Sequence, residues 1–124
     1  MSKVRVLVCD DNREFCELLR EYVESQDDLE LAGVAYNGVE VLDQVEKTEP
    51  DVVVLDIIMP HLGGHDCFLE LKKINPKVKV IVSSGYSMNN EAARMLSGGA
   101  CGFVSKPFDI GKLSKTISDA LQKT

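Results

Sequence analysis

Short apolar runs alternate along the chain with stretches in which apolar residues recur every three or four positions. Such runs are typical of strands buried on both faces, and the longer periodic stretches are typical of amphipathic helices. The predicted strands cover residues 4–9, 29–36, 51–56, 78–82 and 101–105. The predicted helices follow them, with apolar stripes over residues 15–23, 39–45, 68–74, 92–96 and 110–121.

A strand followed by a helix, repeated five times, predicts an α/β fold with a parallel sheet covered by helices on both faces. Right-handed crossovers leave few ways of connecting such strands. We expect a five-stranded parallel sheet of order 2-1-3-4-5, the flavodoxin-like doubly wound arrangement. With 124 residues, the chain fits one domain over residues 1–124 and leaves nothing for a second.

Polar side chains stand where the predicted strands end. Asp10 and Asp11 follow the first strand, Asp56 ends the third, Ser83 and Ser84 follow the fourth, and Lys106 follows the fifth. In an open parallel sheet, ligands bind beyond the carboxyl ends of the strands. We therefore expect these groups to meet at one edge of the sheet.

Three carboxylates in one partly dry pocket repel one another unless a cation shares the site. A hard divalent ion with oxygen ligands, Mg²⁺, is the natural solution. Asp11 would ligate it directly, Asp10 directly or through water, and Asp56 and the backbone carbonyl of Ile58 would add oxygens. A carboxylate can also attack phosphorus, and Asp56, which ends the most apolar strand, is the best candidate nucleophile.

Ser84 and Lys106 would complete a phosphate site, the serine by donating a hydrogen bond to the phosphoryl group and the lysine by pairing with its charge. Simpler interpretations exist for each residue. Asp10 or Asp11 could cap the first helix, and Ser84 could make a local backbone turn.

Charge and composition restrict the partners. A net charge of −6 argues against nucleic acid and against an anionic membrane surface. No apolar run approaches the roughly 20 residues of a membrane span, and the first residues lack the features of a signal peptide. The four cysteines form no C-x-x-C pair and fit buried side chains in a reducing cytosol, so we expect a cytoplasmic protein.

The ordered set Asp10-Asp11, Asp56 followed by Met59-Pro60, Ser84-Gly85 and Lys106-Pro107 resembles the receiver domains of two-component response regulators. The resemblance covers essentially the whole chain. Residues 1–60 are similar to sporulation-type response regulators, and the later part is similar to receivers attached to hybrid sensor kinases, as ordinary divergence or a recombined chain would produce.

This resemblance implies that Asp56 accepts phosphate from the phosphohistidine of a sensor histidine kinase or a histidine phosphotransfer protein, and that Asp10 and Asp11 bind Mg²⁺. It implies that Ser84 is the switch hydroxyl. Phe103, three residues before the lysine, would change rotamer on activation, although Phe103 could equally be a core aromatic. A downstream output protein is a possible further partner.

The protein would then be a signalling switch, not an enzyme, although it would assist its own phosphorylation and dephosphorylation. A phosphorelay carrier that passes phosphate to a histidine on another protein is the alternative. A phosphatase of the haloacid-dehalogenase type would need D-x-D, and Ile58 occupies the second acidic position. A flavodoxin-like cofactor binder would need a phosphate loop where Asp10-Asp11-Asn12 would repel phosphate.

Overall fold

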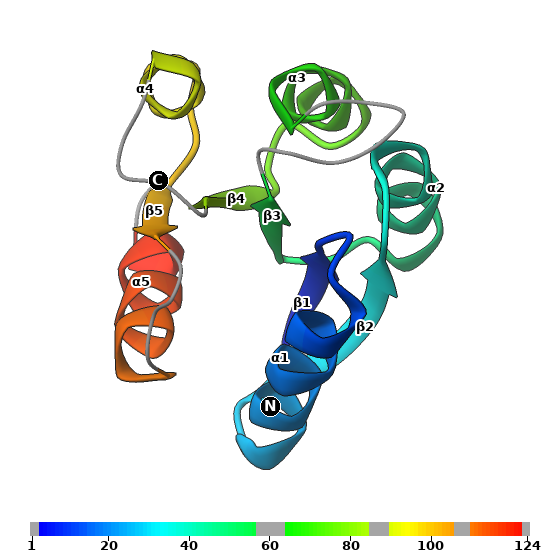
Figure 1. Ribbon diagram of the computed structural model, residues 1–124, viewed down its shortest axis with the longest axis vertical. Helices are drawn as coiled ribbons and strands as arrows, with labels where there is room; N and C mark the ends of the chain where they lie inside the picture. The colour runs from blue at the N-terminus through cyan, green and yellow to red at the C-terminus, as the bar shows by residue number, and fades with distance from the viewer. Residues whose placement is uncertain (1–2, 57–63, 85–89, 106–109, 123–124) are drawn as a thin grey trace.

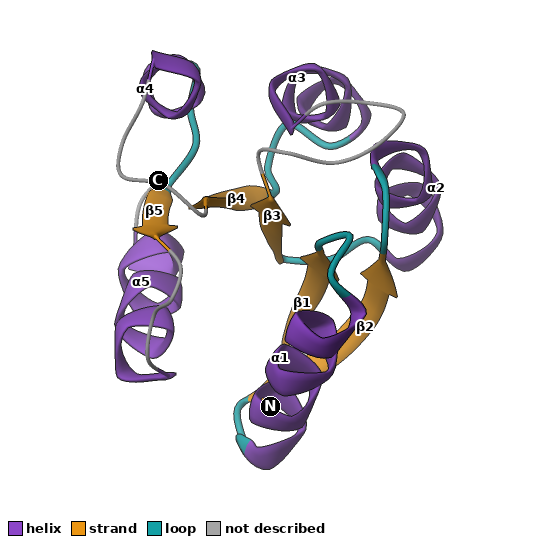
Figure 2. Cartoon of the chain, viewed as in Figure 1, coloured by secondary structure: helices purple, strands orange, loops and turns teal. Residues whose placement is uncertain are grey.

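A computed structural model of the chain describes residues 3–56, 64–84, 90–105 and 110–122. Five strands and five helices alternate along it (Figure 2). They are β1 (Val4–Cys9), α1 (Arg13–Ser25), β2 (Leu29–Ala35), α2 (Gly38–Thr48), β3 (Val52–Asp56), α3 (Gly64–Ile74), β4 (Lys79–Ser84), α4 (Asn90–Ser97), β5 (Gly102–Ser105) and α5 (Ile110–Gln122). None of the helices, over the residues described, is long and apolar enough to cross a membrane.

The strands form one sheet in the order β2-β1-β3-β4-β5, and every neighbouring pair is parallel. Helices α2, α3 and α4 lie along one side of the sheet, and α1 and α5 lie along the other (Figure 1). The predicted doubly wound α/β fold and its strand order are therefore confirmed. This topology brings the carboxyl ends of β1, β3, β4 and β5 to the same edge.

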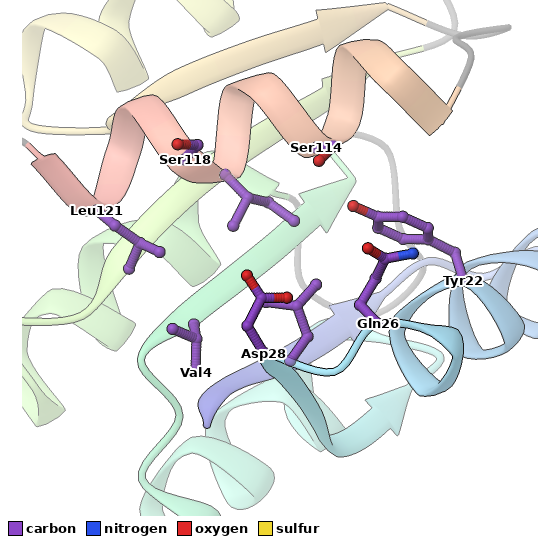
Figure 3. Close-up of a pocket in the computed structure, with 9 residues that line it drawn as sticks. Val4, Tyr22, Gln26, Asp28, Ser114, Ser118 and Leu121 are labelled. Atoms are coloured by element: carbon purple, nitrogen blue, oxygen red, sulfur yellow. The ribbon is translucent and has the colours of Figure 1, made fainter. Parts of the chain in front are cut away.

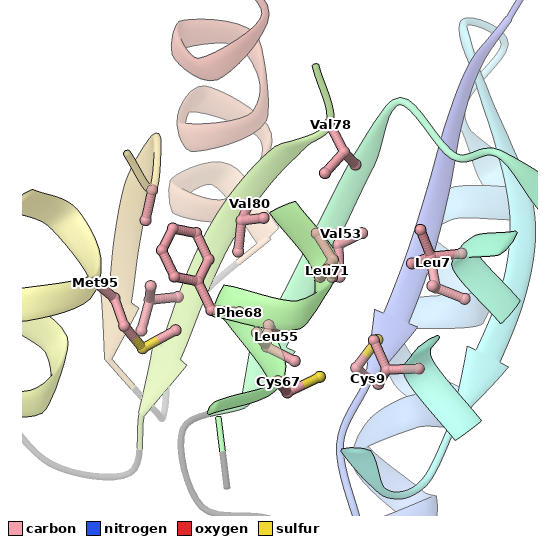
Figure 4. Close-up of a cluster of buried hydrophobic side chains, with 14 of the residues drawn as sticks. Leu7, Cys9, Val53, Leu55, Cys67, Phe68, Leu71, Val78, Val80 and Met95 are labelled. Carbon is pink, nitrogen blue, oxygen red and sulfur yellow. The ribbon is translucent and has the colours of Figure 1, made fainter. Parts of the chain in front are cut away.

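Alternating strand residues divide the core between the two faces of the sheet. Val54 and Ile81 pack with Leu113 of α5 in a buried cluster that we call the α1/α5 core. Leu55 and Phe68 belong to a second buried cluster, the α2–α4 core, which is drawn in Figure 4. All five residues of β3 are buried, as expected for the central strand of a sheet covered on both sides.

Two predicted boundaries were wrong at the carboxyl ends of strands. The fourth strand was expected to stop at Val82, but β4 continues through Ser83 and Ser84. Ser83 pairs with Asp56 of β3, and Ser84 pairs with Ser105 of β5. Pairing with both β3 and β5 therefore holds Ser83 in the sheet, and pairing with β5 holds Ser84 there, despite the polarity of the two residues. The second strand ends at Ala35, one residue earlier than predicted.

Candidate functional site

Three carboxylates meet at the carboxyl edge of the sheet. Asp10 and Asp11 follow β1, and Asp56 is the last residue of β3. One oxygen from each of the three carboxylates lies within 4.8 Å of the other two. Asp10 and Asp56 are 1% and 5% exposed, whereas Asp11 is open to solvent. The predicted convergence of these three residues is thus what the structure shows.

The backbone around Asp10 is fixed by hydrogen bonds from three directions. Its amide donates to the carbonyl of Ala35 at 3.1 Å, and its carbonyl accepts the Cys16 thiol at 3.2 Å. Its carboxylate Oδ1 accepts the amide of Asn12 at 2.9 Å. The β1–α1 connection therefore holds a nearly buried carboxylate at the strand tip.

Neither Asp10 nor Asp11 caps the first helix. The N-cap of α1 is Asn12, whose Oδ1 accepts the amide of Phe15 at 3.1 Å. The simpler interpretation of the two aspartates as helix caps is therefore wrong. Because Asn12 takes the capping role, the two carboxylates are left facing the edge of the sheet where Asp56 ends.

This donor set suits a hard divalent cation. Three carboxylate oxygens at this spacing carry concentrated negative charge, and two of the three side chains are almost removed from water. Such burial of charge is costly unless a cation or hydrogen-bond donors compensate. Mg²⁺ is bound through one or two carboxylates together with waters and phosphate oxygens. Asp10, Asp11 and Asp56 are the residues that would hold it.

Ser84 and Phe103 lie on neighbouring strands and on the same face of the sheet. Phe103 pairs with Val82, and Ser84, two residues beyond Val82, pairs with Ser105. Val82 belongs to the α2–α4 core, and the half-buried Phe103 packs against that core. Ser84 is 2% exposed. Ser84 and Phe103 therefore occupy neighbouring positions on one shared face of β4 and β5.

Two predicted site residues, Ile58 and Lys106, lie outside the described residues. The same holds for four other residues of the motif that supported the resemblance, namely Met59, Pro60, Gly85 and Pro107. The backbone oxygen of Ile58 as a metal ligand and the pairing of Lys106 with Asp56 therefore stay predictions.

Sequence reasoning missed an interaction at the start of α1. The guanidinium carbon of Arg13 lies 4.1 Å from the centroid of the Tyr36 ring, a cation–π contact between the start of α1 and the segment after β2. The two residues are 23 positions apart, and no local pattern in the sequence marks such a pair.

The thiols are free, and three of the four are buried. Burial raises the pKa of Cys9 well above its usual value, and the neighbouring Cys67, Cys16 and Asp10 raise it further. Burial alone raises the pKa of Cys67 to about 12. Cys9 and Cys67 are therefore protonated at neutral pH, and they act as small apolar side chains, as the sequence indicated.

A pocket of about 210 Å³ opens at the opposite edge of the sheet, where Val4 begins β1 and Leu29 begins β2 (Figure 3). It lies between the end of α1 and α5 and is lined by Val4, Tyr22, Gln26, Asp28, Leu29, Ser114, Ile117, Ser118 and Leu121. None of the three clustered aspartates lines it. The chemistry expected at the carboxyl edge therefore does not extend to this pocket.

Comparisons with known proteins agree with this architecture. A sequence model of the response regulator receiver domain matches residues 6–118. A receiver domain protein from Clostridium thermocellum is similar at 30% identity, with 95% of this chain and 94% of that chain covered and a TM-score of 0.87. The response regulator domain of Thermotoga maritima CheB is similar at 27% identity, covering 98% and 99%, with a TM-score of 0.86.

A third solved structure, the CheX-CheY-BeF3-Mg²⁺ complex from Borrelia burgdorferi, contains a chain with a TM-score of 0.91 to this one at 24% identity, covering 98% and 92%. At that identity the likeness shows the fold alone. The family match spans nearly the whole chain, and the acidic cluster stands at the expected strand ends. The chain therefore belongs to the response regulator receiver domain family and is a signalling module of two-component systems.

Proposed function

We propose that Asp56 accepts a phosphoryl group from the phosphohistidine of a sensor histidine kinase, in a reaction that depends on Mg²⁺. The observation that carries the proposal is the approach of one oxygen each from Asp10, Asp11 and Asp56 to within 4.8 Å, at the tips of adjacent strands. Receiver domains bind Mg²⁺ at an acidic pocket of this kind.

In the transfer step, an Asp56 carboxylate oxygen forms a bond to phosphorus while the phosphorus–nitrogen bond of the phosphohistidine breaks. The bonding electron pair returns to the imidazole ring of the kinase. When bound, Mg²⁺ would neutralise charge on the carboxylates and on the phosphoryl oxygens. Asp10 and Asp11 would hold that ion, while Ser84 donates a hydrogen bond to the phosphoryl group and Lys106 pairs with its negative charge.

The covalent phosphoryl group would then switch a partner-binding surface. Ser84 and Lys106 are drawn toward the phosphoryl group, which opens space that Phe103 fills. This route is supported by the position of Ser84 and Phe103 on one face of two neighbouring strands. A preference of a few kcal/mol for one surface is enough to shift the populations usefully.

We place this reaction in the cytoplasm, alongside the catalytic part of the kinase. All four cysteines are free thiols, and a reducing compartment preserves that state.

The first test is phosphorylation of the Asp56→Asn variant. The wild-type chain, incubated with Mg²⁺ and a small phosphodonor such as acetyl phosphate, should gain a phosphoryl group that both acid and alkali release. Asparagine lacks the nucleophilic oxygen, so Asp56→Asn should gain none. Equal labelling of the two proteins, with the same chemical lability, would show that Asp56 is not the acceptor.

A second incubation separates an end-point switch from a phosphorelay carrier. Phosphorylated chain is mixed with a histidine phosphotransfer protein, and the label on each protein is followed over time. A switch should keep its label over the period in which a carrier would lose it. Rapid transfer of the label would identify the chain as a carrier.

A further inference from the structure

Ser83 carries a buried hydroxyl that has no hydrogen-bond partner. The residue is 1% exposed, and its Oγ is the one buried side-chain oxygen or nitrogen without a partner in the part of the chain that the structure describes. Leaving a buried donor unsatisfied costs about 1–3 kcal/mol. Such groups are uncommon in native structures, and each one requires a physical or functional explanation.

The sheet places this hydroxyl beside Asp56. Ser83 pairs directly with Asp56 on one side and with Val104 on the other. Residues paired in a parallel ladder point to the same face, as the pair two residues earlier shows, because Val54 and Ile81 both lie in the α1/α5 core. Asp56 and Ser83 therefore project from the same face of adjacent strands, which lie about 4.8 Å apart.

Ser84 projects from the other face of β4. Ser83 shares its face with Ile81 of the α1/α5 core, and Ser84 shares its face with Val82 of the α2–α4 core. The two consecutive hydroxyls thus approach the end of β3 from opposite sides of the sheet. Only the hydroxyl of Ser83 comes from the face on which Asp56 itself projects.

From this juxtaposition we infer that the Ser83 hydroxyl donates a hydrogen bond to the Asp56 carboxyl group in the phosphorylated state. The inference rests on the proposed function, since it needs Asp56 as the phosphoacceptor. A serine hydroxyl occupies one of three staggered positions, and rotation toward β3 moves it toward the carboxyl group.

That hydrogen bond would speed the loss of the phosphoryl group. In hydrolysis, a water oxygen bonds to phosphorus, the bond from phosphorus to the Asp56 oxygen breaks, and its electron pair stays on the carboxylate. The water proton leaves to solvent, and inorganic phosphate is released. A donor beside the carboxyl group stabilises the negative charge that returns there, and charge-assisted hydrogen bonds are stronger than neutral ones.

The test compares hydrolysis of the acyl phosphate in Ser83→Ala, Ser83→Thr and wild-type chains. Each protein is phosphorylated with labelled acetyl phosphate, freed of donor, and followed in Mg²⁺ buffer. Ser83→Ala should lose the label about tenfold more slowly, the effect of removing one hydrogen bond to a charged group. Ser83→Thr keeps the hydroxyl and should restore a rate near that of the wild type.

Ser118→Ala provides the matched control, because it removes an exposed hydroxyl from α5, on the same side of the sheet. Its rate should equal that of the wild type. Ser83→Cys nearly keeps the shape of serine and donates only weakly, so it tests the same point should Ser83→Ala fold poorly. A thermal melt of each variant establishes that it is folded.

Unchanged hydrolysis in Ser83→Ala, together with a raised melting temperature, would overturn the inference. That result would show that the hydroxyl is only a destabilising buried group. Asp56→Asn in the same assay keeps the two proposals apart. Labelling of Asp56→Asn would contradict the proposed function. If Asp56 is labelled but the lifetime of the phosphoryl group is the same in Ser83→Ala as in the wild type, only the inference is contradicted.

Discussion

At the scale of single residues, three carboxylates whose oxygens lie within 4.8 Å of one another repel each other unless a cation shares their site. Asp10 and Asp56 are nearly buried, so little water is present to screen the interaction between their carboxylates. Asp11 lies on the solvent-exposed side of the cluster. A divalent cation converts this repulsion into attraction. Removal of one carboxylate should therefore have opposite effects in the absence and in the presence of Mg²⁺.

Asp11→Asn should raise the melting temperature in EDTA, because it removes one of three mutually repelling charges. It should also shrink the rise in melting temperature that Mg²⁺ produces, because one ligand is lost and ligand binding stabilises the folded state in proportion to affinity. Thermal melts in EDTA and across a Mg²⁺ titration measure both effects. Asp119→Asn, which removes an exposed carboxylate from α5, should leave both unchanged.

A full Mg²⁺ response in Asp11→Asn would mean that Asp11 is not a ligand.

Individual site residues were predictable where side-chain type and strand end coincide, as at Asp10, Asp11 and Asp56. The orphaned hydroxyl of Ser83 was not predictable in this way. Its meaning depends on the strand beside it and on the face to which it points.

At the scale of elements, the contact between β5 and α5 is close enough to restrict sequence. A methyl group added at Gly102 would lie 2.7 Å from Cγ2 of Thr116 on α5. Thr116 has little freedom to turn away, because its Oγ1 donates to the carbonyl of Lys112 at 2.8 Å and β-branched side chains are stiff in helices. Because β5 also carries Phe103, the packing of α5 against β5 affects the strand on which the proposed switch residue lies.

Gly102→Ala should therefore destabilise the domain by about 1–3 kcal/mol, the usual cost of overpacking. The opposing gain from a less flexible unfolded chain is smaller, about 0.4–1 kcal/mol. Urea denaturation measures the net effect. Thr116→Ser removes the obstructing methyl group and keeps the hydroxyl, so the double variant should recover most of the loss. A Gly102→Ala chain as stable as the wild type would contradict the close contact.

Element type and order followed from periodicity alone, since all five strands and five helices are present where apolar runs and stripes predicted them. The end of β4 did not follow. Ser83 and Ser84 resemble a loop in composition, but pairing of Ser83 with β3 and of both serines with β5 keeps them in the strand. Pairing between distant segments decides such boundaries, and local propensity does not record it.

For the molecule as a whole, cysteine burial gives a check of the packing on both sides of the sheet. Cys9 and Cys67 lie in the α2–α4 core and Cys16 lies in the α1/α5 core, all at most 1% exposed, whereas Cys101 is half-buried. Ellman's reagent at pH 8 should thus react rapidly with one thiol per native chain and with four in urea. Rapid reaction of two or more native thiols would contradict the packing.

The raised thiol pKa values also predict how stability changes with pH. Unfolded thiols ionise near pH 9, whereas Cys67 in the fold keeps its proton to about pH 12. The native state therefore binds more protons between these values, and stability should fall as pH rises through that interval. Urea denaturation at pH 8 and pH 10 measures the decline, which Cys67→Ala should make shallower. An equal decline in Cys67→Ala would assign the effect to other groups.

The central claim is that the tip of β3 carries the phosphoacceptor, and chemical mapping of the modified residue tests it most directly. The chain is phosphorylated with acetyl phosphate and Mg²⁺, reduced with borohydride, digested and sequenced by mass spectrometry. Borohydride converts an aspartyl phosphate to homoserine, so the account predicts homoserine at position 56. Homoserine at another aspartate, or none in a chain that carries label, would contradict it.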